Sequence, residues 1–162
     1  MASTYRTKRK KIVDAYVEQL KGINGQHPYN SNLFNEVHGV TVFIDQISQY
    51  PSVCVIAGDE TREYQPNGFK WRFLNMDIRV YVEDAEDPQE ELALLIEDIE
   101  RVIDDNDVLT YDDSVSPNEK TTSSTILTIT TDEGVLSPLG IGEIAIQVRY
   151  WKTKLQADKY LA

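Results

Sequence analysis

The sequence predicts an α+β fold, with a mixed or antiparallel β-sheet of about four main strands and two amphipathic helices packed on one face of it. Two segments carry apolar residues every three or four positions, which predicts helices. Other segments alternate apolar and polar residues and are joined by hairpin-type turns, which predicts strands. With 162 residues, of which 41% are hydrophobic, we expect a single domain over residues 1–152 and a polar C-terminal tail over residues 153–162.

The first helix is predicted over residues 4–22. Ser3 or Thr4 can cap its start, and Gly22 and Gly25 end it. Its apolar residues form one stripe, which consists of Ile12, Val13, Tyr16, Val17, Leu20 and Ile23.

A loop is predicted over residues 24–39, and residues 40–50 fit either a strand or one or two helical turns. A short strand follows from Ser52 to Ala57, and Gly58 closes it. Residues 59–68 are polar and end in the turn-forming pair Asn67–Gly68. We therefore expect a mobile hairpin-type connection there.

Residues 69–83 predict the strongest strand of the chain. Its second half places apolar residues at even positions, namely Met76, Ile78, Val80 and Val82. Its first half places them at odd positions, namely Phe69, Trp71 and Phe73. A bulge near Leu74–Asn75 would bring both sets to one face, and we expect one there.

The second helix has a complete set of start signals. Asp87 fits the N-cap, Pro88 the first helical position, and Glu90 a capping-box spacing. We expect a buried stripe of Leu92, Leu95, Ile96, Ile99, Val102 and Ile103. The acids Glu90, Glu91, Glu97, Asp98, Glu100 and Asp104 are expected largely outside that stripe. A polar loop over residues 104–124 and strands over 125–131 and 143–151 complete the prediction.

The charges are segregated along the chain, whose net charge is −11. The first eleven residues contain five cations and no acid: Arg6, Lys8, Arg9, Lys10 and Lys11. Residues 83–113 contain fourteen acids and one base, Arg101, a net charge of −13. Such an acidic surface repels nucleic-acid phosphates. The two regions are either solvated surfaces or complementary contacts between copies of the chain, and the sequence leaves both interpretations open.

No motif of catalysis, metal binding or cofactor binding stands out. His27 and His38 lie in the loop region, and the chain has no glycine-rich phosphate loop and no HExxH motif. The acids at 104–107 lack the glycine and glutamate of a calcium loop. The acids at 83–91 could hold a divalent ion for a hydrolase, but they lie at a strand end and a helix start, where carboxylates also serve as caps, so a divalent-metal hydrolase is the weaker alternative. We expect no enzyme, no catalytic residue, no metal and no cofactor.

The expected cellular location rests on the cysteine content and on the length of the apolar runs. The single cysteine, Cys54, excludes an internal disulfide. The apolar runs are far shorter than the ~20 residues of a membrane span, so we expect no membrane partner and a soluble product inside a cell.

Candidate interface residues lie in three places. They are the five N-terminal cations, the polar residues Asp59, Glu60, Arg62, Glu63 and Tyr64, and Trp151 at the end of the last strand. Trp71 and Trp151 could also form an exposed aromatic patch with Tyr81 and Tyr150. For Trp71 we expect a place in the core.

Several segments resemble one family in their order along residues 5–152. The first helix ends in Gln19–Leu20–Lys21, and Tyr50–Pro51–Ser52–Val53–Cys54–Val55 follows. The acidic turn from Thr131 to Gly140 leads into the closing strand from Glu143 to Tyr150. This order resembles the tail terminator, or tail completion, proteins of long-tailed, siphovirus-type bacteriophages, the lambda U-like group.

The resemblance implies an α+β virion protein that forms a homohexameric ring. Such a ring caps the tail tube, stops its polymerisation and offers a surface for head–tail joining. The implied partners are further copies of the chain, the tail tube protein and a neck or head-completion protein, and DNA passes through the ring without specific binding. The implied location is the head-proximal end of the tail, after assembly in the host cytoplasm. The acidic stretch 83–113 would line either the lumen or the outside. A neck connector and an acidic module that mimics DNA are the alternatives.

Overall fold

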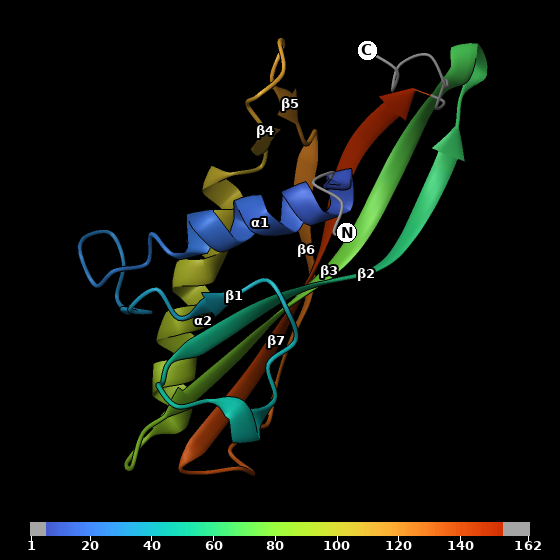
Figure 1. Cartoon of the computed structure of the whole chain (residues 1–162). Coiled ribbons are helices and arrows are strands. Elements are labelled where there is room, and N and C mark those ends of the chain that lie inside the picture. Colours follow the sequence, from blue (N-terminus) through green and yellow to red (C-terminus); the bar gives the residue numbers. More distant parts are fainter. Residues whose placement is uncertain (1–5, 154–162) are drawn as a thin grey trace, which may run out of the picture.

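A computed structural model describes residues 6–153 (Figure 1). Two helices and one large sheet account for most of these residues. The elements are α1 (Lys8–Leu20), β1 (Val37–His38), the 3-10 turn η1 (Ile44–Gln46), β2 (Ser52–Tyr64), the 3-10 turn η2 (Pro66–Gly68), β3 (Phe69–Glu83), α2 (Pro88–Asp105), β4 (Thr110–Asp112), β5 (Glu119–Lys120), β6 (Ser123–Thr131) and β7 (Leu139–Thr153). Ser3, Thr4 and nearly all of the predicted C-terminal tail lie outside the described residues.

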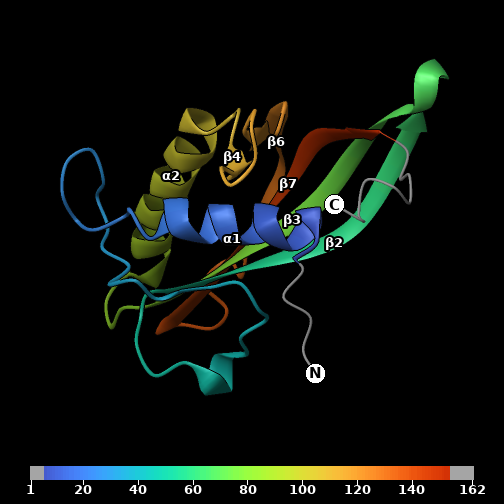
Figure 2. The same ribbon diagram turned by 45° about the horizontal axis from the view of Figure 1, so that its top comes forward.

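The large sheet has five strands in the order β1-β2-β3-β7-β6. The pair β1–β2 is parallel and the other pairs are antiparallel, so the sheet is mixed. Both helices lie on the same face of it (Figures 1 and 2). The predicted α+β class is therefore confirmed. The region predicted as a polar loop over 104–124 contains a second, two-stranded sheet, β4–β5.

Helix α1 begins four residues later than expected. Thr7 has an extended backbone, and its hydroxyl accepts the N–H of Lys10 at 3.2 Å. The capping residue is thus Thr7, and the expectation of Ser3 or Thr4 is wrong. The predicted apolar stripe is buried as expected.

Helix α2 begins as predicted, because Asp87 accepts the N–H of Glu90 at 3.1 Å. One of its acids departs from the prediction. Asp98 is 0% exposed, and its carboxylate accepts the backbone N–H groups of Asn30, at 3.0 Å, and Ser31, at 2.7 Å. Asp98 therefore holds the loop after α1 against α2. Its carboxylate supplies the acceptors for backbone N–H groups that have no strand partner.

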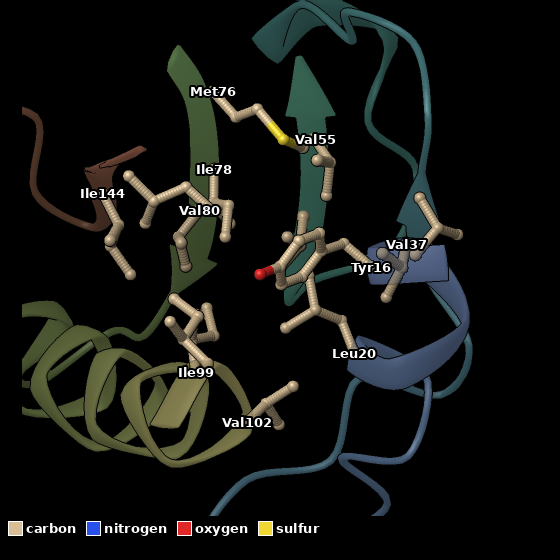
Figure 3. Packing of buried hydrophobic residues seen from close by; sticks show 14 of the residues in the cluster. Tyr16, Leu20, Val37, Val55, Met76, Ile78, Val80, Ile99, Val102 and Ile144 are labelled. Carbon is tan, nitrogen blue, oxygen red and sulfur yellow. The ribbon is translucent and has the colours of Figure 1, made fainter. Parts of the chain in front are cut away.

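The core lies between the helices and the sheet (Figure 3). Tyr16 and Leu20 of α1 face Ile99 and Val102 of α2, and the sheet closes the cluster from the other side. The sheet residues labelled in the same view are Val37, Val55, Met76, Ile78, Val80 and Ile144, and all of them are buried. The even-numbered apolar residues of β3 thus face the helices, as the alternation predicts.

The prediction of a mobile loop over residues 59–68 is wrong. Strand β2 continues to Tyr64, which pairs with Lys70 of β3, and only the short turn η2 separates the two strands. The hairpin and the end of β7 extend well beyond the helices (Figure 1). We call this projection the arm, and define it as residues 60–75 and 147–153. The sequence looks loop-like here because the residues of β2 that face the helices are charged.

The predicted bulge also lies elsewhere. Strand β3 alternates without interruption, and the register shift is on β2, between Ala57 and Glu60. Phe69, Trp71 and Phe73 therefore point away from the helices. Trp71 lies on the outer face of the sheet, so the expectation that it completes the core is wrong.

Candidate functional site

A cluster of charged residues occupies the side of the arm that faces the helices. The Glu60 carboxylate is 4% exposed and accepts hydrogen bonds from the Tyr150 hydroxyl at 2.6 Å and from Arg62 Nε at 2.9 Å. Arg72 Nε and Arg9 Nη1 each lie 4.0 Å from it. Arg9 Nη2 also donates to the Gly58 carbonyl at 2.6 Å. The cluster therefore joins the base of the arm to α1.

The surroundings of Glu60 favour its charged form. Burial raises the pKa of Glu60, but the hydrogen bonds from Tyr150 and Arg62 and the charge of Arg72 outweigh it, so that the pKa lies below its usual value. Burial raises the pKa of Tyr150 to about 12, so that its hydroxyl remains a donor. Sequence analysis selected Glu60, Arg62 and Arg9 but missed Tyr150 and Arg72, because only the strand pairing brings the five together.

Aromatic side chains gather on the outer face of the arm. Phe69 stacks on Trp151 with ring centroids 5.5 Å apart and meets Trp71 edge-on at 5.1 Å. The Arg149 guanidinium lies 4.5 Å from the centre of the Trp71 ring. Trp151 is 47% exposed. We call these four residues the aromatic cluster. Phe69 and Trp71 are half-buried, and such a partly exposed aromatic group is typical of an interaction site.

The aromatic patch considered from the sequence does not form with its tyrosines. Tyr150 is fully buried against the core, and Tyr81 donates to the Val42 carbonyl at 3.0 Å under the segment around η1. Tyr150 and Trp151 are consecutive on β7, so their side chains point to opposite faces of the sheet.

Two of the N-terminal cations contact the β4–β5 hairpin. Lys8 pairs with the Glu119 carboxylate of β5, and Lys11 Nζ lies 2.6 Å from Asp112 of β4. Arg6 and Lys10 share Asp14, at 2.7 and 2.9 Å, on the exposed side of α1. The five cations thus divide into Lys8 and Lys11 at the β4–β5 hairpin, Arg9 at the base of the arm, and Arg6 and Lys10 on the exposed side of α1.

The remaining candidates lie on the arm and its base. Asp59 is exposed at the bulge, and Glu63 accepts a hydrogen bond from Gln65 at 2.8 Å on the outer face. The exposed Tyr64 ring lies 5.4 Å from Lys70 Nζ. The structure therefore brings Arg9, Glu60 and Arg62 together, whereas Trp151 belongs to a separate cluster on the opposite face.

The Lys11–Asp112 pair predicts an acid-dependent part of the stability. Hydrogen bonds from Lys11 and Ser114 lower the pKa of Asp112 to about 2. We expect Lys11→Met to lower the free energy of unfolding at pH 7 by about 1 kcal/mol. Because the pKa of Asp112 is lower in the folded protein, the contribution of the pair to the free energy of unfolding is complete above the unfolded-state pKa of about 4. This contribution is lost as the pH falls toward about 2.

Urea unfolding of both proteins across this pH range measures the difference. Lys10→Met, which removes only an exposed pair with Asp14, is the matched control. A difference between Lys11→Met and wild type that stays constant down to pH 2 would contradict the assignment.

The described residues contain no group of three or more His, Cys, Asp or Glu side chains suited to hold a metal ion. Cys54 is buried, and burial raises the pKa of its thiol, which makes it a weak nucleophile. Neither helix is long and apolar enough to cross a membrane, within residues 6–153. The aromatic cluster is the surface feature described above that is suited to contact with another protein.

Two comparisons of the sequence point to one protein family, and a comparison of structures finds a similar fold. A family model described as "Bacteriophage Tail Tube Terminator Protein" matches residues 6–159. The tail tube terminator protein p142 of Escherichia phage T5 is 39% identical over 150 residues, which cover 88% of this chain and 92% of that protein. A chain from the virion of a native gene transfer agent particle has a similar fold, with a TM-score of 0.56 and 11% identity over 87% of this chain and 95% of that one.

Proposed function

The chain belongs to the bacteriophage tail tube terminator family, and we propose that it forms a ring on the end of the tail tube and stops the tube from growing. Family membership makes it a structural protein of the phage tail and not an enzyme. The resemblance inferred from the sequence is thereby confirmed. The neck-connector and DNA-mimic alternatives lose their support, since the family match concerns the tail tube itself.

The aromatic cluster is the observation that carries the proposal. A protein that caps a tube must bind the last ring of tube subunits and leave no site for the next ring. The arm extends beyond the helices (Figure 1). Strand parity and the ring contacts place Phe69, Trp71 and Trp151 together on its outer face. Partly exposed aromatic residues beside an arginine are the composition most often found at the centre of protein interfaces. We assign this face of the arm to the tail tube protein.

The ring is proposed to be a hexamer that DNA passes through on its way down the tail. An excess of negative charge, −11 per chain, supports this role, because phosphates are repelled by an acidic wall and do not stick to it. The face opposite the tube would offer the surface for the neck or head-completion protein, which places the ring at the head-proximal end of the tail after assembly in the host cytoplasm.

The experiment adds the purified chain to polymerising tail tube protein and measures tube length by electron microscopy. We expect tubes to stop growing soon after the addition, with labelled chain found at tube ends only. Light scattering of chain released from the tubes is expected to show a mass near six times 18.5 kDa. Tubes that grow equally long with and without the chain would contradict the proposal, as would label spread along the tube walls.

The aromatic cluster makes its own prediction. We expect Trp151→Ala to reduce the affinity for tube ends roughly tenfold, because it removes an exposed aromatic anchor of the interface. Its thermal stability should change little, since the side chain is 47% exposed. Tyr64→Ala, which removes an exposed ring from the opposite face of the arm, is the control. Equal losses in both variants would show that the outer face has no special role.

A further inference from the structure

The large sheet has two open edges, and each lies beside a groove. β1 pairs with β2 only at Val53 and Cys54, and in the described part of the chain no strand pairs with the outer edge of β2 beyond them. At the other end of the strand order, β6 pairs with β7 on one side only, again among the described residues. Unpaired strand edges of this length are places where another chain can add.

The groove beside β6 is apolar and acidic. It has a volume of about 520 Å³ and lies between α2 and the edge strand. Within residues 6–153, the charged side chains that line it are Glu97 and Glu100. The edge strand β6 carries Leu127, which is 51% exposed, and Ile129, which lines the groove. We call this surface the acidic flank.

The groove beside β2 is apolar and basic. It has a volume of about 420 Å³ and lies between the first turns of α1 and the segment after β1. Among the residues that the structure describes, its charged lining residues are Arg9 and Lys10, and its apolar wall includes Val13, Ile56 and Val40, which is 64% exposed. We call this surface the basic flank. Among the described residues, Lys10 pairs with the half-buried Asp14, a weak pair that leaves its charge available to a partner.

We propose that the acidic flank of one copy docks on the basic flank of the next copy. The two flanks lie at opposite ends of the strand order, carry opposite charge and each combine an apolar groove with an open strand edge. A contact between two different surfaces of the same chain is head-to-tail, and it closes into a ring when the rotation per subunit fits. This inference rests on the proposed function, and it names the residues through which the ring subunits meet.

Charge reversal tests the docking. We expect Lys10→Glu alone and Glu97→Lys alone each to weaken self-association roughly tenfold, because each places like charges in one interface. The double variant K10E/E97K reverses both sides of every contact, so association should return to within about threefold of wild type. Sedimentation across a range of concentrations measures association, and tube length in the polymerisation experiment measures the ring that forms on the tube.

Matched controls lie on the same helices. Lys21→Glu reverses a cation at the far end of α1, and Glu91→Lys reverses an exposed acid of α2, and neither residue lines a flank groove. Both controls should behave as wild type. A wild-type chain that leaves tube growth unchanged would contradict the proposed function itself. Two results would contradict docking of these two flanks. In the first, K10E and E97K stop tube growth as well as wild type does. In the second, the double variant folds but does not regain self-association.

Discussion

Replacing Asp98 with alanine is expected to lower the free energy of unfolding by about 3 kcal/mol. The Asp98 carboxylate is fully buried and accepts the backbone N–H groups of Asn30 and Ser31 together with the Asn30 side-chain amide, at 3.2 Å. Its removal takes away the one carboxylate that accepts all three donors and that holds the loop against α2. Urea unfolding at neutral pH measures the loss.

The control for this prediction is Asp104→Ala, an exposed acid on the same helix that should cost less than about 0.5 kcal/mol. Hydrogen exchange gives a second, local measurement. The amides of Asn30 and Ser31 should lose protection in Asp98→Ala, while those in the middle of β3 keep it. An unfolding free energy equal to that of wild type would show that the loop is held by other contacts.

Replacing Glu60 with alanine is expected to have a comparable effect, about 3 kcal/mol, located in the arm. Glu60 is the acceptor for Tyr150 and Arg62 and lies 4.0 Å from Arg72, whose Nε is buried and has no hydrogen-bond partner among the described residues. Without Glu60, the positive charge of Arg72 stays buried without its counter-charge. The amides of residues 60–64 should therefore exchange faster, because the hairpin opens more often.

The pH dependence of the Glu60 contribution has a definite sign. The pKa of Glu60 is lower in the folded protein than in the unfolded chain. Its contribution to the free energy of unfolding is therefore complete above the unfolded-state pKa and is lost as the pH falls through the folded-state pKa. Tyr150→Phe keeps the buried ring and removes one donor, so it should cost only about 1 kcal/mol. If Glu60→Ala and Tyr150→Phe cost the same, or if exchange in the arm does not change, the cluster does not hold the arm.

The sequence predicts those elements whose periodicity and packing agree. Both helices and the strands that close the sheet combine a regular apolar pattern with capping or turn residues, and each lies close to where it is expected. A hairpin-type connection is expected over residues 59–68, but the pairing of residues 60–64 with β3 is missed for a physical reason. Glu60 and Arg62 face the helical side of the sheet as charged residues, and only their pairing with Arg72 and Tyr150, distant in the sequence, makes that placement stable.

Tertiary context also explains the other corrections. Asp98 occupies a position that helical periodicity marks as peripheral, yet the loop around Asn30 covers it. A place for Trp71 in the core requires a bulge in β3. The structure has its register shift on the partner strand β2 instead. The edges of the sheet, which define both flanks, depend on strand order, and strand order is a property of the whole chain.

The most direct test of the central claim is the tail-length distribution of the phage with and without this chain. Electron micrographs of particles made without it should show tails that are longer than normal and unequal in length, and a supplied copy of the chain should restore one length. Tails of normal, uniform length in its absence would contradict the account, because another component would then stop the tube.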